Sequence, residues 1–340
     1  MRIATYNVEW FDNLFEDAGG LREDAGWSGR QDVTRLEQIT ALGVVFQALD
    51  ADAVMIIEAP DQSSRRSTVR ALETFAARFD LRCNRALAGF PTETQQEIAL
   101  LYDPAMLTVG HDPQGAPTGK KGAHDAPRFD GVFRIDLDND GHEDLVTWSK
   151  PPLEIAARTE SGRELRLIGV HAKSKAPHGA RTRAEVIRLS IENRRKQLAQ
   201  CVWLRARVVH HLLAQESVIV LGDFNDGPGL DEYEQLFGRS GVEVVMGENG
   251  APSLHDPHVH QALTRRFAAP PVTARFQMTD GSYLSALLDY IMISGDLLPL
   301  GPRWRIWHPF DDAACFSDPV LREALLAASD HFPVTLDIAL

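Results

Sequence analysis

The chain has few cysteines and no long apolar run. Its 340 residues include only three cysteines, Cys83, Cys201 and Cys315, which lie far apart. Their small, odd number excludes a disulfide-stapled scaffold and suits a reducing compartment. No stretch approaches the roughly 20 apolar residues of a membrane span, and the start, "MRIATYNVEWF", lacks the basic head and apolar stretch of a secretion signal. We therefore expect a cytoplasmic protein with no membrane association.

Positive charge is also scarce, and it is unevenly distributed. The net charge of −13 argues against a protein that coats nucleic acid through bulk electrostatics. Between Lys173 and Arg207, however, the chain has ten Lys or Arg residues and only two acids. One strongly basic segment therefore lies on an acidic body, and nothing in the sequence indicates an obligate protein partner.

The chain contains no solenoid-type repeat, so strand and helix patterns have to indicate its fold. Apolar residues spaced by three or four predict helices over 32–49, 66–79 and about 182–213. Proline and glycine punctuate 110–130, which predicts a long loop. The mixture favours packed sheets covered by helices, in a single α/β domain over residues 1–340. Runs rich in β-branched residues predict strands over 2–8, 52–58, 97–103, 131–137, 143–149, 164–172, 217–223 and 287–294.

Polar side chains end or interrupt many of these apolar runs. A strand would deliver each of them to the rim of a sheet, where together they would form an oxygen-rich site. Mg²⁺ prefers oxygen ligands, and Mn²⁺ tolerates histidine as well, so the set indicates a divalent-cation site. A cation there would stabilise the carboxylates and could polarise a phosphoryl oxygen or activate water. The residues are Asn7, Glu58, His171, Asp223, Asn225, Asp289, Asp330 and His331.

Taken singly, these residues have simpler explanations. An aspartate at a strand end is usually a turn former, and a lone histidine is usually a structural residue. Taken together, they match one known set in order. The matching stretches are "TYNV" (5–8), "MIIEAPD" (55–61), "GVHAKSK" (169–175), "LGDFND" (221–226), "LDYIMIS" (288–294) and "SDHFPV" (329–334).

On these stretches the chain resembles the endonuclease/exonuclease/phosphatase superfamily, and in particular its deoxyribonuclease-like, bacterial nuclease-like members. The superfamily includes pancreatic deoxyribonuclease, apurinic endonucleases, inositol-polyphosphate phosphatases and neutral sphingomyelinases. The resemblance implies a four-layered α/β/β/α sandwich of two packed mixed sheets flanked by helices. It places the active site at the edge where both sheets meet.

The resemblance also implies a role for each catalytic candidate. Asp223 would orient or deprotonate the attacking water, and Asn225 would position Asp223 and the phosphate. His331, held by Asp289, would contact the scissile phosphate. His171 would assist the leaving group or the phosphate. In-line attack of water on a phosphodiester needs such a base, a cation at the phosphoryl oxygens and help for the departing oxygen.

The implied metal site centres on Glu58 as the principal ligand, with Asn7 and Asp330 close to a Mg²⁺ or Mn²⁺ ion. The surrounding motifs depart from the family's pattern in two places. Ile57 precedes Glu58 where glutamine is usual, and Leu288 replaces an arginine that many members have.

The departures leave room for another cation near the phosphate. Arg128, in "APRFDG", could supply it; a surface arginine is the alternative. Lys173 and Lys175 follow the predicted catalytic histidine directly and are expected beside the reaction centre.

The basic segment is the best indication of the substrate. Arg181, Arg188 and Arg195 repeat every seven residues, so we expect them on one helix face, where they could follow the phosphates of a polynucleotide. A solvated helix face remains the alternative. No stacking platform for bases and no apolar lipid-binding hairpin is evident.

Three functions remain open. The first is a divalent-metal-dependent phosphodiesterase of nuclease type that cleaves DNA or RNA. The second is a phosphatase or phosphodiesterase that acts on a small soluble phosphate ester. The third, a catalytically dead scaffold, is disfavoured because the predicted catalytic residues are retained.

Overall fold

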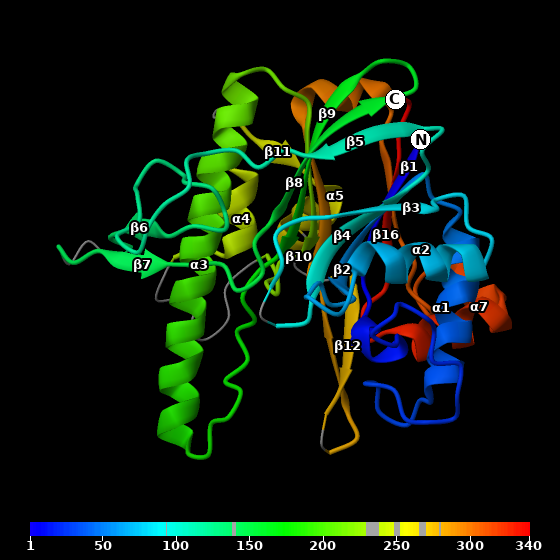
Figure 1. Cartoon of the computed structure of the whole chain (residues 1–340). Coiled ribbons are helices and arrows are strands. Elements are labelled where there is room, and N and C mark those ends of the chain that lie inside the picture. The colour runs from blue at the N-terminus through cyan, green and yellow to red at the C-terminus, as the bar shows by residue number, and fades with distance from the viewer. Residues whose placement is uncertain (93, 138–140, 229–237, 248–251, 265–269, 279) are drawn as a thin grey trace.

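In the computed structural model, two six-stranded mixed sheets pack face to face (Figure 1). The structure describes residues 1–340 except 93, 138–140, 229–237, 248–251, 265–269 and 279. The first sheet contains, in order, β15 (Arg303–Ile306), β16 (Val334–Asp337), β1 (Arg2–Asn7), β2 (Ala53–Ala59), β4 (Glu97–Tyr102) and β3 (Arg85–Ala88). The second contains β11 (Leu254–His255), β14 (Asp289–Ser294), β10 (Val218–Asp223), β9 (Glu164–His171), β8 (Leu153–Thr159) and β5 (Leu107–His111).

Two hairpins extend from this body. One pairs β6 (Phe133–Ile135) with β7 (Asp144–Val146), and the other pairs β12 (Ala274–Gln277) with β13 (Tyr283–Ala286). Short 3-10 helices occupy Phe11–Leu14 and Gly295–Leu300. The hairpin of β12 and β13 projects beyond the sheets at the lower side of Figure 1.

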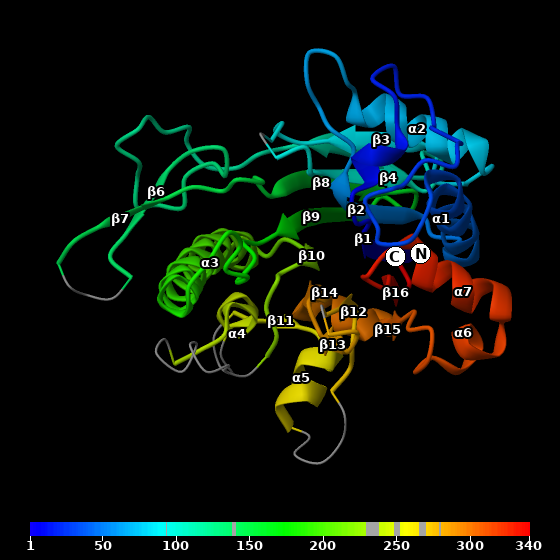
Figure 2. The same cartoon turned by 90° about the horizontal axis from the view of Figure 1, so that it is seen from below.

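Helices cover the outer faces of both sheets. On the first sheet lie α1 (Arg35–Leu49), α2 (Thr68–Arg78) and α7 (Pro319–Ala328), which follows the short α6 (Ala313–Ser317). On the second lie α3 (Arg183–Leu213), α4 (Gly241–Met246) and α5 (Pro257–Thr264). Figure 2 shows α3 and α4 on one side and α1 and α7 on the other, with both sheets between them. The expected four-layered α/β/β/α sandwich is therefore confirmed.

The alternation of side chains along the strands creates the cores between these layers. In β1, Ala4 and Tyr6 face the helices, whereas Ile3 faces the second sheet. Both faces of the central strands are buried, so their sequences read as nearly continuous apolar runs. The sheets approach closely at Gly169, where an added Cβ atom would lie 2.4 Å from Met55 Sδ.

The three predicted helices are present, and two of them begin with a capping box. Thr34 caps α1 together with Glu37, and Thr182 caps α3 together with Glu185. No strand or helix occupies 112–132, which agrees with the predicted long loop. Prediction missed the shorter or more polar strands, among them β8 and β15, whose charged residues interrupt the apolar pattern.

All three cysteines are free and buried. Within the described residues, no helix combines the length and apolar character that crossing a membrane requires. That residues 1–340 form a single domain stays a prediction.

Candidate active site

Parallel strand pairing brings the predicted polar residues to one edge of the sandwich. β1 runs parallel to β2, and β9 runs parallel to β10, so Asn7, Glu58, His171 and Asp223 lie at or next to their carboxyl ends. β14 runs antiparallel to β10 and starts with Asp289 directly opposite Asp223. Asn7 Nδ2 donates to Asp223 Oδ2 at 3.0 Å, and this bond joins the two sheets.

Unusual backbone geometry aims several of these side chains. Glu58 has φ 62° within a β-bulge between Ile57 and Ala59, and Asn225 has φ 50°. Gly222 has φ +138°, and an added Cβ atom would lie 2.0 Å from Val170 O. Trp10, whose amide N–H donates to Glu58 Oε2 at 3.3 Å, also has a left-handed φ of 55°. Such conformations cost energy and cluster at functional sites, which supports this edge as the active site.

Asp223 lies at the centre of a network of amide donors. Asn225 donates its backbone N–H to Oδ1 at 2.7 Å and its side-chain Nδ2 to Oδ2 at 3.1 Å. The Asp223 side chain is almost completely buried, and this burial raises its pKa to about 7, although the His331 cation opposes the rise. A carboxylate with this pKa can accept a proton from water near neutral pH.

His331 and Asp289 form a buried pair opposite Asp223. His331 Nδ1 lies 2.7 Å from Asp289 Oδ2. Burial alone would lower the pKa of His331, but the carboxylates of Asp289 and Asp223 hold it well above its ordinary value. One ligand atom from each of these three residues lies within 4.8 Å of the others. Because a protonated imidazole cannot bind a metal, this geometry favours His331 as a donor to phosphate.

His171 differs from His331 in charge. Burial, followed by the nearby Lys150 and His331 cations, lowers its pKa well below the usual value, so His171 is neutral. Its Nε2 lies 3.2 Å from Lys150 Nζ, 3.7 Å from Asp223 Oδ2 and 3.9 Å from Glu58 Oε1. Lys150 therefore lies beside both principal carboxylates.

The residues predicted to bind a metal have suitable oxygens available. Asn7 Oδ1 is buried and has no hydrogen-bond partner among the described residues. The amide nitrogen of the same side chain donates to Asp223. Burial raises the pKa of Glu58, and Asp330 adds to the rise. A cation near Glu58, Asn7 and Asp330 would satisfy the amide oxygen and neutralise both carboxylates. These donors fit a hard divalent ion.

Sequence and structure comparisons agree with this geometry. The family model described as the Endonuclease/Exonuclease/phosphatase family matches residues 4–331. The chain belongs to this family. It is therefore a hydrolase of the endonuclease/exonuclease/phosphatase type, and the predicted family resemblance is confirmed.

Several solved structures are similar to this chain at low sequence identity. Truncated TDP2 from Caenorhabditis elegans is 15% identical, with a TM-score of 0.50 and coverage of 98% of this chain and 96% of that chain. The human Nocturnin catalytic domain is 15% identical, with a TM-score of 0.49 and coverage of 100% and 94%. The mannosyl-6-phosphatase Bt3783 of Bacteroides thetaiotaomicron is 13% identical, with a TM-score of 0.48 and full coverage of both chains. No curated protein matches the sequence.

Among the predicted phosphate-binding residues, Lys173 lies near Lys150, beside the candidate catalytic groups. Its positive charge lowers the pKa of Lys150, although burial of Lys150 has the larger effect. Lys175 Nζ pairs with the buried Asp226 at 2.6 Å. Arg128 pairs with Asp130 at 2.6 Å and covers the Phe90 ring.

The predicted arginine stripe on α3 needs a correction. Arg181 precedes the N-cap residue Thr182, so it lies outside the helix and does not share a face with Arg188 and Arg195. The capping box explains the boundary, because Glu185 accepts the backbone N–H groups of Arg181 and Thr182. The described contacts of Arg128 and Lys175 are thus to Asp130 and Asp226, and the Arg181 backbone N–H bonds to Glu185.

Sequence reasoning missed two charged residues at the site. Lys150 lies in the irregular segment between β7 and β8, just before two prolines. Glu9 lies in the turn directly after β1, two positions beyond Asn7. Burial, followed by Asp330, raises the pKa of Glu9 to about 7, and Glu58 adds to the rise.

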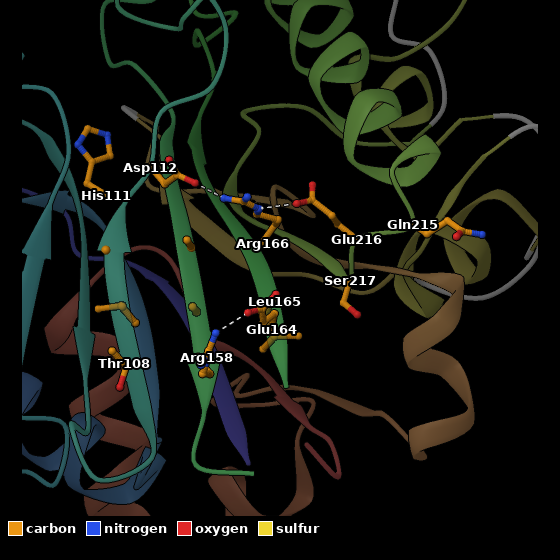
Figure 3. A pocket seen from close by; sticks show the side chains of 14 residues that line it. Thr108, His111, Asp112, Arg158, Glu164, Leu165, Arg166, Gln215, Glu216 and Ser217 are labelled. Atoms are coloured by element: carbon orange, nitrogen blue, oxygen red, sulfur yellow. Dashed lines mark hydrogen bonds and ion pairs between the residues drawn. The ribbon is translucent and has the colours of Figure 1, made fainter. Parts of the chain in front are cut away.

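A cavity of about 630 Å³ lies at the opposite end of the second sheet (Figure 3). Arg166, near the start of β9, pairs there with Asp112 and Glu216, and Arg158 pairs with Glu164. Its charged groups therefore neutralise one another. Since His171 ends the same strand, this cavity is separate from the catalytic cluster.

Proposed function

We propose that the protein is a divalent-metal-dependent phosphodiesterase of nuclease type. The observation that carries this proposal is the placement of a buried carboxylate, Asp223, opposite a protonated His331, with one ligand atom of each within 4.8 Å of the other. A base and a cationic donor are thereby positioned on a single reacting centre. In-line hydrolysis of a phosphate ester requires this combination.

In the proposed reaction, Asp223 accepts a proton from the water whose oxygen attacks phosphorus. Asn7 and Asn225 hold the carboxylate in place through their amide groups. His331, fixed by Asp289, donates a hydrogen bond to a non-bridging oxygen, where negative charge grows. The ester bond on the opposite side of phosphorus breaks, and the departing oxygen takes a proton from solvent water. Lys150, which lies beside Asp223 and Glu58, offsets the negative charge of the phosphoryl group.

Glu58, with Asn7 and Asp330, would hold the divalent ion, Mg²⁺ or Mn²⁺. When bound, such an ion polarises the phosphoryl oxygens and offsets the charge of the phosphodiester. Glu9 lies close enough to Asp330 and Glu58 for their charges to interact, so it would support the same ion.

The basic segment favours nucleic acid as the substrate. The N-terminal half of α3 extends past the sheet edge at which β9 and β10 end, on the side of the catalytic residues (Figure 1). Arg188 is 60% exposed and pairs with Glu192, and Arg195 is 37% exposed and pairs with Asp144. The Arg188–Glu192 pair is exposed and of a weak kind, so Arg188 can turn to a phosphate.

The experiment that tests the proposal compares several substrates with Mg²⁺ or Mn²⁺. Plasmid DNA, single-stranded DNA, RNA, bis-p-nitrophenyl phosphate and p-nitrophenyl phosphate are incubated with the protein and with the variants Asp223→Ala and His331→Ala. We expect cleavage of polynucleotide and diester, and a loss of about a hundredfold or more in either variant because a general base or an electrostatic donor is removed.

The matched control is Glu164→Gln, an exposed carboxylate at the other end of β9. It should retain the rate of the unaltered protein. Circular dichroism and thermal unfolding establish that each variant is folded. Near-normal turnover in a folded Asp223→Ala or His331→Ala variant would contradict the proposed chemistry.

A small phosphate ester is the second candidate substrate. The proximity of Lys150 and Lys173 favours it, because two adjacent cations suit the extra charge of a terminal phosphate. Cleavage of the monoester alone in the same assay would select this candidate and reject the nuclease.

A further inference from the structure

A second cavity, of about 360 Å³, adjoins the catalytic cluster. On one side it is lined by the loop that contains Arg30 and Gln31, and on the other by the hairpin of β12 and β13. Glu9 and Asp330 also line it, so it opens directly beside the proposed metal ligands. Its volume is within the range of roughly 300–1,000 Å³ that is typical of small-ligand sites.

The hairpin presents an aromatic and cationic surface to this cavity. The Arg275 guanidinium carbon lies 3.5 Å from the centre of the Tyr283 ring and 5.3 Å from the centre of the Phe310 ring. Arg275 forms no ion pair with any carboxylate of the described residues. Tyr283 is 49% exposed, although large aromatic side chains usually bury most of their surface.

Two amides complete the lining. Gln31 and Gln277 both line the cavity, and neither side chain forms a hydrogen bond within the described part of the chain. Amide groups can donate and accept at once, which is what the edge of a nucleobase requires. A planar ring stacked on Tyr283 would therefore find polar groups at its edge.

The hairpin is attached to the catalytic pair by direct contacts. Thr273 Oγ1 accepts the backbone N–H groups of Leu288 at 2.9 Å and Asp289 at 3.0 Å. The Arg275 backbone N–H donates to Asp330 O at 2.7 Å. The Phe276 ring contacts the His331 ring, with 5.6 Å between their centres. A group bound by the hairpin is thus held at a fixed position relative to the reacting phosphorus.

We propose that this cavity is a nucleobase subsite, in which Tyr283, backed by Arg275, stacks on the base of a nucleotide next to the scissile phosphate. The inference rests on the proposed nuclease function and extends it. Base–aromatic stacking is tolerant of sequence, because every base has a π face. The subsite therefore positions an unpaired nucleotide without selecting among the four bases, which predicts a preference for single strands.

The test uses a single-stranded hexanucleotide with one cleavable phosphodiester and phosphorothioates elsewhere. It is prepared in DNA and in RNA, with both central bases present, or with the base missing on one or the other side of the cleavable bond. The unaltered protein should show a kcat/KM at least about tenfold higher when the base that occupies the subsite is present. In Tyr283→Ala the ratio between substrates with and without that base should fall toward one, and in Tyr283→Phe it should be retained.

Leu284→Ala is the matched control on the same hairpin. Leu284 is 53% exposed, but it does not line the cavity. This variant should keep the ratio of the unaltered protein, and thermal unfolding should show that all three variants are folded.

The outcomes separate the inference from the function on which it rests. Cleavage with a ratio unchanged in Tyr283→Ala, or near one in the unaltered protein, overturns the subsite alone. An equal fall of this ratio in Leu284→Ala also overturns the subsite, because the hairpin would then act as a general apolar surface. No cleavage of either polymer by the unaltered protein overturns the nuclease function, and the subsite with it.

Discussion

Glu58, the proposed metal ligand, has a cost to stability. Its side chain is held in a left-handed bulge and is only 14% exposed, next to the carboxylate of Asp330. Burial raises its pKa in the folded protein above the value in the unfolded chain. The stability contribution of such a group is present at low pH and is lost as the pH rises through the folded pKa.

Glu58→Gln should therefore stabilise the metal-free protein while it abolishes turnover. In a chelator at pH 8, we expect the free energy of unfolding to increase, since the amide removes a negative charge whose burial raises the pKa of Glu58 in the folded protein. The difference should shrink as the pH is lowered through the folded pKa. Chemical denaturation at both pH values measures it.

Addition of Mn²⁺ should make the unaltered protein more stable than Glu58→Gln, because the ion binds the glutamate and not the amide. The control, Glu164→Gln, changes an exposed carboxylate and should leave stability nearly unaltered in each condition. Equal stabilisation of both proteins by Mn²⁺ would show that Glu58 does not bind the ion.

At the scale of single elements, the β10 strand depends on Gly222. The residue precedes Asp223 and has φ +138°, and an added Cβ atom would lie 2.0 Å from the Val170 carbonyl oxygen on β9. Both the backbone conformation and the space therefore require glycine.

Gly222→Ala should destabilise the protein by at least about 3 kcal/mol, because backbone atoms on both strands would have to move. Denaturant titration measures this change. Gly110→Ala in β5 is the matched control, since an added Cβ atom there meets nothing within 4 Å. A small effect at position 222 would mean that β9 and β10 separate easily.

The arginines in the N-terminal half of α3 and in the segment before it are predicted to bind polynucleotide. Replacing Arg181, Arg188 and Arg195 together with glutamine should weaken polynucleotide binding. The slope of log K against log salt should decrease by about two to three, since each lost phosphate contact removes roughly 0.7–0.9.

The control for α3 changes three other exposed arginines by the same total charge. Arg78, Arg85 and Arg158 are 54%, 61% and 64% exposed and lie on other elements. Fluorescence anisotropy at several salt concentrations compares the two triple variants. Equal slopes in both would assign the α3 arginines to ordinary solvated surface.

At the scale of the whole molecule, the sequence predicted the layers and most of the polar residues that the structure brings together at the sheet edge. Asn7, His171 and Asp223 were recognisable because each is a polar residue that ends an apolar strand. Lys150 was not, because no strand was predicted after it: Glu154 and Arg158 interrupt the apolar run of β8. Glu154 instead forms an ion pair at 2.7 Å with Arg207, which is far away in the sequence.

The positions of basic side chains were the hardest to predict. Lys175 follows the catalytic strand as expected, but its partner Asp226 comes 51 residues later in the chain and is completely buried. Which of several cations remains available to a substrate depends on such tertiary pairs. A list of charges along the chain therefore overestimates the number that contact phosphate.

The close approach of the sheets at Gly169 has a consequence for the reaction far from that residue. Asn7 and Glu58 belong to one sheet, whereas His171 and Asp223 belong to the other. The thickness of the central core therefore sets the distance between the two halves of the proposed active site. A bulkier residue at position 169 would collide with Met55 and push the two sheets apart. It should slow hydrolysis by misaligning the site residues of the two sheets, and a smaller residue at position 55 should restore the rate.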